Sequence, residues 1–422
     1  MERIKTKAEM VIRSLCKEVK NSSETLYCLL LGVYLLSLLL EKVRFAFSSS
    51  YRMQLVQILT VAALILLGVS IASILVMVIN RKWALIPALL LAEGMLILCA
   101  RMQKDMFDGV MIALLAIGTY GKNYEKLLKV YLGCFTGTLA IAMLGVPLGL
   151  TVETPKIGRY GTGLSFGFTH PNVWGFYVFI TFVIIWLLYI RNTSRRVRMV
   201  YLVFSVLLAV FMVFVPKCRT QALLLLLFPI AVMVCKKLAT GKRTLVQTVV
   251  SWIFIIFPFV CFLLTIFLST QREWLVVHTF GTYVENFSKR FIQGGLALRE
   301  HGLPLFGELI RFQADTVEHL GNHDISLYVL DNGYVTYVIY RGMIWMVPAL
   351  FWLSLGNRRM IQKKDYSLLA ISMLLSLLGT MERYPLEMFN FLFLYPIATL
   401  EGAGDTAVPA VQDNDDAGLG YD

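Results

Sequence analysis

The chain has 422 residues, of which 58% are hydrophobic and 16% are charged, and its mean hydropathy is +0.70. This composition excludes a soluble globular protein and a disordered chain, because apolar runs long enough to cross a bilayer recur from end to end. The formal net charge is +12, but no nucleic-acid partner is expected for a protein of this class.

We predict twelve transmembrane helices, since one span needs about 20 mostly apolar residues. In chain order they cover roughly residues 26–41, 57–79, 83–100, 106–120, 127–150, 172–190, 199–215, 220–235, 245–268, 333–354, 366–381 and 386–400. The predicted fold class is an all-α polytopic membrane protein, with its transmembrane domain over 26–400. A cytoplasmic segment, 1–25, precedes it. An acidic tail, 401–422, has too little apolar surface to fold.

The Lys and Arg residues predict the orientation of these spans, because short cytoplasmic loops accumulate basic residues. They crowd residues 3–20 and the loops after the even-numbered spans, such as 191–198 and 358–364. Both termini are then cytoplasmic. The stretch 270–332, between the ninth and tenth spans, becomes a large outward-facing loop.

Several basic residues run against this bias and fall at or near the outer ends of spans. They are Arg159, Lys217, Arg219, Arg272, Lys289, Arg290, Arg299, Arg311 and Arg383. Arg presents a planar fork of donors that fits phosphate, so we expect these residues to meet an anion such as a lipid pyrophosphate. The alternative is that each one snorkels to the interface or pairs with a carboxylate such as Glu153, Glu273 or Glu285.

The first outward cluster leads into the sixth span, from Gly158 to Asn172. Its glycines keep the loop from being a regular helix, whereas Pro171 suits the first turn of the helix that follows. Thr169 or His170 then lies near the positive end of that helix, a natural site for an anion or a sugar hydroxyl. The alternative is an ordinary cap and turn.

Two short outward turns carry further charged residues. Lys217 and Arg219 lie between the seventh and eighth spans, where they either bind phosphate or snorkel. Glu382 and Arg383 follow the eleventh span, where they either contribute to a substrate site or form a purely structural ion pair.

The long outward loop contains a predicted amphipathic helix over residues 282–300. Its apolar side holds Tyr283, Phe287, Phe291 and Leu298. We expect this helix to rest on the bilayer surface, where it would cover a lipid-linked substrate from above.

Two residues near the end of this loop are candidate general bases. Asp331 stands at the mouth of the tenth span beside the headgroup zone, where it is either a base or an ordinary N-cap. His323 competes for the role, because an imidazole accepts a proton near neutral pH.

The sequence holds no motif for a metal or a nucleotide. Neither C-x-x-C nor H-E-x-x-H spacing occurs, and G-x-x-x-x-G-K-[ST] and G-x-G-x-x-G are missing too. We therefore expect no metal and no cofactor. Any transfer reaction would draw its driving force from an activated substrate.

Five motifs follow one another in a fixed order along the chain. They are R-x-G-T-G-x-x-x-G-F-T-H-P-N ending at Asn172, C-R-T at 218–220, N-F-S-K-R-F-x-x-x-x-x-A-L-R from Asn286 to Arg299, P-L-F-G at 304–307, and L-D-N-G-Y followed by Arg341-Gly342. Together they resemble the Wzy-type repeat-unit polymerases of bacterial capsule and O-antigen assembly, which belong with the O-antigen ligases.

The resemblance implies a glycosyltransferase of the bacterial cytoplasmic membrane. Such an enzyme moves a growing glycan en bloc from undecaprenyl pyrophosphate onto an incoming repeat unit that is itself linked to undecaprenyl pyrophosphate. The implied partners are the lipid-linked donor and acceptor and membrane lipid, with a chain-length regulator and a flippase as candidate protein partners.

The resemblance also implies roles for individual residues. Arg219 and Arg290 would hold the donor pyrophosphate, and Asp331 would be the base, although a His stands at that place in the related ligases. The remaining expected substrate contacts are Arg159, His170, Asn172, Arg299, His323, Tyr334, Glu382 and Arg383.

Two other functions stay open. A ligase of the same family would attach a finished glycan to lipid A or to another acceptor. A flippase or transporter would place its polar residues near the bilayer midplane, whereas charges within the spans are sparse here and consist mainly of Glu93.

Overall fold

The computed structural model describes residues 24–46, 116, 118–119, 122–153, 155–158, 161–239, 245–271, 285–308, 317–320, 323–326, 332–383 and 391–399. Within these ranges it leaves out the side chains of 156–158, 161, 239, 285–289, 317–320 and 323–326. Nearly all of the predicted segment 1–25 and the whole tail 401–422 lie outside the described residues.

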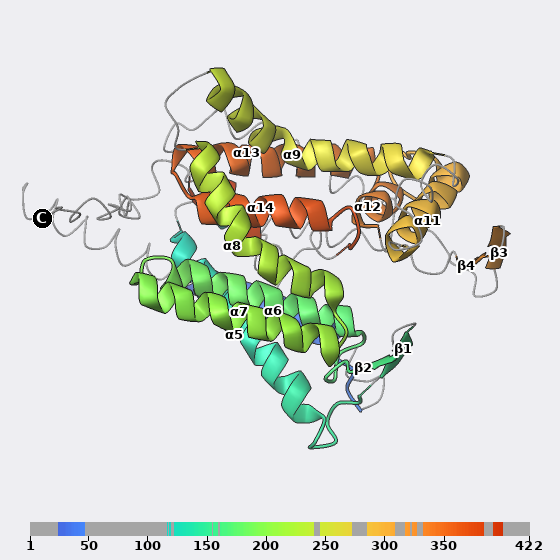
Figure 1. Cartoon of the computed structure of the whole chain (residues 1–422), viewed down its shortest axis with the longest axis horizontal. Helices are drawn as coiled ribbons and strands as arrows, with labels where there is room; N and C mark the ends of the chain where they lie inside the picture. Colours follow the sequence, from blue (N-terminus) through green and yellow to red (C-terminus); the bar gives the residue numbers. More distant parts are fainter. Residues whose placement is uncertain are drawn as a thin grey trace, which may run out of the picture.

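The described chain is mostly helical and forms two groups of helices that α8 (Arg219–Ala239) joins (Figure 1). The first group holds the helix Glu24–Glu41, α5 (Tyr124–Gly145), α6 (Pro171–Ile185) with its π-helical extension Trp186–Ile190, and α7 (Arg195–Phe214). The second holds α9 (Leu245–Thr270), α11 (Glu285–His301), α12 (Gly333–Arg341), α13 (Met343–Gln362) and α14 (Tyr366–Leu378). α8 packs against α6 and α7 on one side and against α14 on the other.

Short elements complete the described chain. Two antiparallel hairpins join β1 (Lys156–Gly158) to β2 (Gly161–Gly163) and β3 (Val317–Leu320) to β4 (His323–Ser326). In register, Lys156 lies opposite Gly163 and Val317 lies opposite Ser326. The 3-10 turn Phe391–Phe393 and the short helix α15 (Tyr395–Ala398) pack on α13.

Six helices in the described part of the chain are long and apolar enough to cross a membrane. They are Glu24–Glu41, Tyr124–Gly145, Pro171–Ile190, Arg195–Phe214, Arg219–Leu238 and Leu245–Thr270. The apolar windows of Arg195–Phe214 and Leu245–Thr270 are only 17% and 22% buried within the protein. Because so much exposed apolar surface is unstable in water, we describe the chain as a membrane protein.

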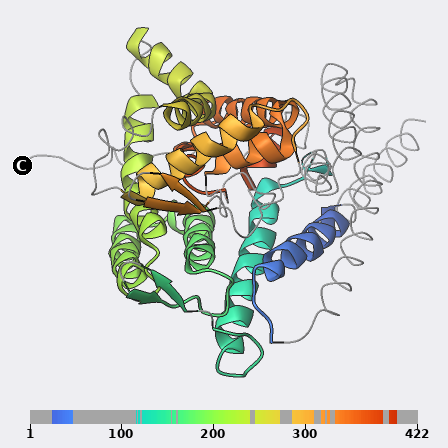
Figure 2. The same ribbon diagram turned by 90° about the vertical axis from the view of Figure 1, so that its right-hand side faces the viewer.

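The first predicted span and the fifth to the ninth are confirmed as helices, each within a few residues of its expected bounds. The helix Glu24–Glu41 lies beside α5 (Figure 2), where the Cys134 thiol donates a hydrogen bond to the Gly32 carbonyl at 3.4 Å. The predicted spans 57–79 and 83–100 fall outside the described residues, as does nearly all of 106–120.

The prediction of one continuous span over 333–354 is wrong, because the helix breaks at Gly342. This residue has φ +80° and ψ +166°, a conformation that in practice only glycine adopts. A Cβ at this position would collide with the carbonyl oxygen of Leu305. The predicted span is therefore divided between the short helix α12 and the helix α13, whose 20 residues measure about 30 Å, enough to cross a bilayer.

The loop after α11 caps the first turn of α13. The amides of Met343 and Ile344 donate to the carbonyls of Pro304 and Leu305 at 2.9 and 3.1 Å. The first amides of a helix have no partner inside the helix, so these two carbonyls satisfy them. The P-L-F-G motif thus has a structural role at the break.

The last two predicted spans are shorter than expected. α14 ends at Leu378 rather than at residue 381. In the predicted range 386–400 the described residues form the 3-10 turn Phe391–Phe393 and the four-residue helix α15, not one long helix. The early end of α14 leaves Met381 and Glu382 outside the helix.

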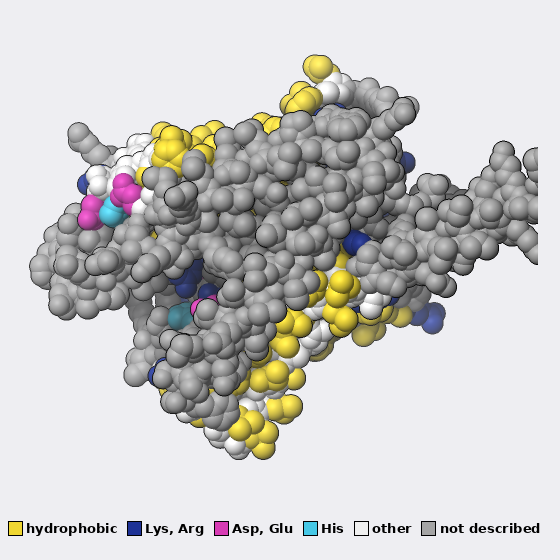
Figure 3. Space-filling view, turned by 180° about the vertical axis from the view of Figure 1, so that it is seen from behind, with side chains coloured by type: hydrophobic (Ala, Val, Ile, Leu, Met, Phe, Trp, Pro, Cys, Tyr) yellow, Lys and Arg dark blue, Asp and Glu magenta, His cyan; other side chains and the backbone are white. Residues whose placement is uncertain are grey.

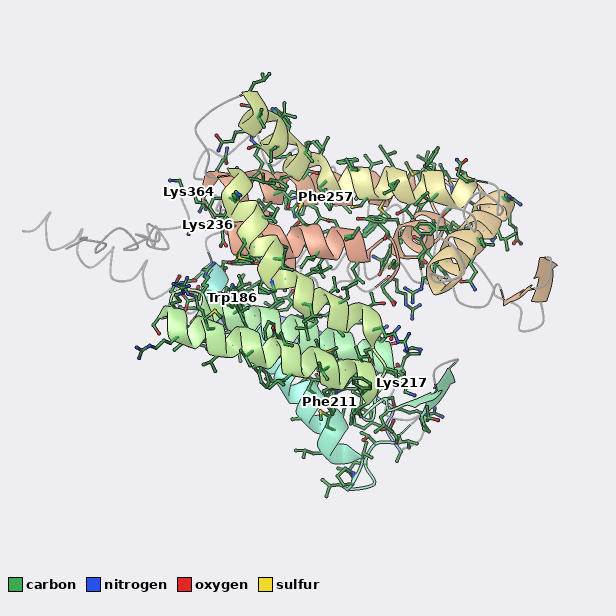
Figure 4. The ribbon with its side chains drawn as sticks, viewed as in Figure 1. Trp186, Phe211, Lys217, Lys236, Phe257 and Lys364 are labelled. Atoms are coloured by element: carbon green, nitrogen blue, oxygen red, sulfur yellow. The ribbon has the colours of Figure 1, made fainter. Side chains whose placement is uncertain are left out.

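The basic residues predicted on opposite sides of the membrane lie at opposite ends of the helices. Figure 4 shows Lys236 and Lys364 at one end and Lys217 at the other. We call the second end the Lys217 end. The starts of α6 and α8 and the turn after α14 lie at this end.

Candidate functional site

The start of α6 follows the prediction made from Pro171. His170 has extended backbone angles and is the N-cap, and its Nδ1 accepts a hydrogen bond from the Asn172 amide at 3.0 Å. Pro171 occupies the first turn, where its missing N–H costs nothing. His170 is thus an ordinary helix cap through its Nδ1, as the alternative interpretation predicted. The side chain of Asn172 takes no part in this cap and makes a longer-range contact.

The turn between α7 and α8 packs on this helix start. The Cys218 thiol is buried and donates to the Pro171 carbonyl at 2.8 Å, and the amide of Leu164 donates to the Val215 carbonyl at 3.4 Å. Burial, together with a smaller effect of the Glu382 carboxylate, raises the pKa of the Cys218 thiol to about 12. The first two outward clusters of the sequence are thus in contact.

Lys217 and Arg219 stand on either side of this buried cysteine. Lys217 adopts the left-handed region with φ +61°, which is uncommon for a residue with a side chain. Arg219 is exposed and opens α8, so its positive charge lies at the positive end of the helix dipole, an unfavourable place by a few tenths of a kcal/mol. Local helix stability therefore does not account for an Arg at this position.

Glu382 connects three distant parts of the chain. Its Oε1 accepts from NH2 of Arg290 at 2.9 Å and from Nδ2 of Asn172 at 3.2 Å. NH1 of Arg290 also donates to the Met381 carbonyl at 2.7 Å. The side chains of Arg290 and Glu382 are 15% and 3% exposed. We call Asn172, Arg290 and Glu382 the Glu382 cluster.

All three residues were predicted substrate contacts, but their contacts with one another were not predicted. Arg290 and Glu382 are 92 positions apart, and Asn172 and Glu382 are 210 apart. The structural alternative paired Glu382 with its neighbour Arg383, whereas the ion pair found is with Arg290. Arg383 is exposed, and its backbone lies beside Gly333.

The predicted amphipathic helix exists as α11, but its apolar side faces protein rather than lipid. Phe291 and Leu298 are buried, and Ala297 and Leu298 pack with residues of α12. Gly294 and Gly295 allow α11 to approach Ser269 at the end of α9 closely. The side chains of Tyr283 and Phe287 lie outside the described residues. This packing holds Arg290 over the turn after α14.

The start of α12 lies against the same turn. A Cβ on Gly333 would lie 2.5 Å from the Glu382 carbonyl oxygen and 2.9 Å from that of Gly379, so only glycine allows this approach. Asn332 is the N-cap of α12, and its Oδ1 accepts from the Val335 amide at 3.2 Å. The chain immediately after Asp331 is therefore in contact with the Glu382 cluster.

Two of the expected substrate contacts lie elsewhere. The prediction for Tyr334 is wrong, because its ring is fully buried against Phe262 and its hydroxyl donates to the Ser376 carbonyl at 2.9 Å. Arg299 lies in the last turn of α11, nine residues from Arg290, which is about 13 Å along the helix. It stands at the far end of α11 from the Glu382 cluster.

Three other expected site residues cannot be placed by their side chains. Arg159 and Asp331 lie outside the described residues, and His323 is described only by its backbone, as the first residue of β4. Their predicted roles stay predictions. Asn332, in contrast, was missed, although an Asn directly before a helix start is a recognisable capping signal.

Seen from behind, the surface has a hollow in which Lys or Arg, acidic and His side chains lie together (Figure 3). The Glu382 cluster supplies guanidinium and amide donors around one carboxylate, a set that suits phosphate or sugar oxygens. Among the side chains that the structure describes, no three His, Cys, Asp or Glu residues are grouped to hold a metal ion.

The positions from four separate clusters of the sequence thus meet at the Lys217 end of the helices. They come from the start of α6, the turn before α8, the helix α11 and the turn after α14, and the start of α12 joins them. Comparisons of this chain with protein-family models, with curated proteins and with solved structures found no match.

Proposed function

We propose that this chain is a metal- and nucleotide-independent glycosyltransferase of the bacterial cytoplasmic membrane, a polymerase of undecaprenyl-pyrophosphate-linked repeat units. The observation that carries the proposal is the Glu382 cluster, in which Arg290 and Asn172 meet one carboxylate at the Lys217 end of the helices. Donors for phosphate and sugar oxygens therefore converge where a lipid headgroup would lie, not at the middle of the spans.

In the proposed reaction a hydroxyl oxygen of the acceptor sugar attacks the anomeric carbon of the donor glycan. The bond from that carbon to the pyrophosphate oxygen breaks, and undecaprenyl pyrophosphate leaves with the electron pair. Asp331 takes the proton of the hydroxyl. Arg219 and Arg290 stabilise the negative charge that develops on the leaving group, so the bond energy of the donor drives the transfer.

The ion pair with Glu382 is compatible with this role of Arg290. The guanidinium has five N–H donors, and the two contacts to Met381 and Glu382 use two of them. The carboxylate fixes the plane of the guanidinium, which reduces the freedom lost when a substrate binds.

The test is polymerisation by the purified chain in lipid vesicles supplied with lipid-linked repeat units. We expect the wild type to give a ladder of chain lengths. Arg290→Ala and Arg219→Ala should each reduce its formation by a hundredfold or more, on the order of the effect of losing one oxyanion donor. Arg196→Ala is the matched control, because Arg196 is an exposed Arg in the first turn of α7. Wild-type rates in both site variants would overturn the proposal.

The same assay separates the two alternatives. A ligase would give a single transfer to lipid A or another acceptor, without a ladder. A flippase would form no new glycosidic bond, and cells without it would retain lipid-linked units inside. Loss of a polymerase would instead leave single units displayed outside.

A further inference from the structure

The side-chain amide of Asn332 is held in place through its oxygen, whereas its nitrogen has no hydrogen-bond partner among the described residues. Asn332 is fully buried, and its Oδ1 caps α12 through the Val335 amide. Its carbonyl also accepts from the Thr336 hydroxyl at 2.6 Å. Nδ2 is buried and has no hydrogen-bond partner among the residues that the structure describes. Because the cap fixes the plane of the amide, it also fixes the direction of the two Nδ2 hydrogens.

The helix that Asn332 caps packs against the helix that carries Arg290. A Cβ on Gly294 of α11 would lie 3.3 Å from Cγ2 of Val335 of α12. Ala297 and Leu298 of α11 form one apolar cluster with Val335 and Ile339 of α12.

One turn earlier on each helix lie Arg290 and Asn332. The turn after α14 contacts the first part of both helices. Arg290 of α11 donates to Met381 and Glu382, and Gly333 of α12 approaches the Glu382 carbonyl. Asn332, the residue before Gly333, therefore stands next to the turn that Arg290 contacts.

A cap alone does not explain an Asn at this position. Asp, Ser and Asn cap helices about equally well, and Asp or Ser would cap α12 without burying an unused N–H donor. A buried donor without a partner is unfavourable, and such groups in native proteins call for a specific explanation. A substrate oxygen that enters the Glu382 cluster would supply the missing acceptor.

We propose that Nδ2 of Asn332 donates a hydrogen bond to an oxygen of the lipid-linked substrate, alongside Arg290. The inference rests on the proposed glycosyltransferase function and adds a substrate contact to it. The acceptor is either an oxygen of the pyrophosphate or an oxygen of the first sugar. Either oxygen would supply the acceptor that Nδ2 lacks among the described residues.

Three substitutions separate capping from substrate binding. Asn332→Asp and Asn332→Ser keep a capping oxygen but remove the Nδ2 donor, whereas Asn332→Ala removes both. We expect Asn332→Ser to melt near the wild-type temperature. Asn332→Ala should melt lower because the cap is lost, and Asn332→Asp should melt lower because it buries a carboxylate. All three should lower the rate of polymerisation about tenfold or more, the effect of losing a hydrogen bond to a charged or tightly held oxygen.

The matched control is Asn123→Asp. Asn123 is the N-cap of α5 and accepts from the Glu125 amide at 2.9 Å, so it is an Asn cap in which the same change can be made. This variant should keep both its melting temperature and its activity.

Binding measurements with undecaprenyl pyrophosphate and with the lipid-linked repeat unit identify the acceptor. Weaker binding of both probes by Asn332→Ser assigns the oxygen to the pyrophosphate, and weaker binding of the repeat unit alone assigns it to the sugar. Wild-type binding and rates in both Asn332→Ser and Asn332→Asp would overturn the inference. A wild type that binds both probes but forms no polymer would overturn the polymerase proposal instead.

Discussion

Removing the carboxylate of Glu382 should have a large effect on stability, because it would leave Arg290 charged and mostly buried. Breaking a buried ion pair by removing one partner costs about 3 to 5 kcal/mol, and since Arg290 keeps 15% of its side-chain surface we expect the lower end for Glu382→Ala. The lost bond to Asn172 adds about 1 kcal/mol. Glu382→Gln keeps the Oε1 acceptor for both partners. It should therefore cost only about 1 kcal/mol, the difference between a charged and a neutral hydrogen bond.

The assay is unfolding in detergent, followed by tryptophan fluorescence, for Glu382→Ala, Arg290→Met and the double variant. We expect a coupling energy of at least about 1 kcal/mol for this pair. A coupling below about 0.5 kcal/mol, or equal losses for Glu382→Ala and Glu382→Gln, would refute the reasoning.

A second ion pair provides the control for activity. NH1 of Arg191 lies 3.0 Å from Oδ1 of Asp365, and the two side chains are 23% and 17% exposed. Asp365 is also the N-cap of α14, so Asp365→Asn keeps a capping oxygen while it removes the charge. This variant should lose some stability but polymerise at the wild-type rate per folded molecule, whereas Glu382→Gln should lose activity as well.

Two further predictions concern the backbone break and the buried thiol. Gly342→Ala should destabilise the protein by about 3 kcal/mol or more, because the residue has φ +80° and its Cβ would overlap Leu305; a melting temperature equal to that of the wild type would contradict the close contact. The Cys218 thiol should resist iodoacetamide at pH 8, because burial raises its pKa from 9.0 to about 12. The folded state holds this proton longer than the unfolded chain does, so the stability from Cys218 is complete below about pH 9 and is lost as pH rises toward 12. Mass spectrometry of a variant whose other cysteines are Ser would show rapid modification if the thiol were open to solvent.

Local sequence signals predicted much of the fold. Apolar runs located the helices, and Pro171 located the start of α6, because both signals depend only on neighbouring residues. The break at Gly342 escaped this reasoning, since its cause is a contact with Leu305, 37 positions away. The packing of α11 escaped it too, because an apolar helix face looks the same in sequence whether lipid or protein covers it.

The residues of the site were predicted in part, because local signals point to single residues but not to contacts between distant ones. The charge rule singled out Arg290 and Glu382 as residues near the outer ends of spans, but no local pattern states that they pair. Tyr334 was placed in the site because it follows Asn332 and Gly333, whereas the helical turn directs its ring toward Phe262 in the core.

The order in which the chain is made gives the Glu382 cluster a consequence for biogenesis. Arg290 is synthesised 92 residues before its counterion Glu382, and Asn172 is synthesised 210 residues before Glu382. Until Glu382 leaves the ribosome, Arg290 and Asn172 lack the carboxylate that joins them in the finished structure. A nascent chain that stops before Glu382 thus lacks the group that holds the start of α6 and the helix α11 to the turn after α14. Assembly of the cluster is therefore a late step in the synthesis of this chain.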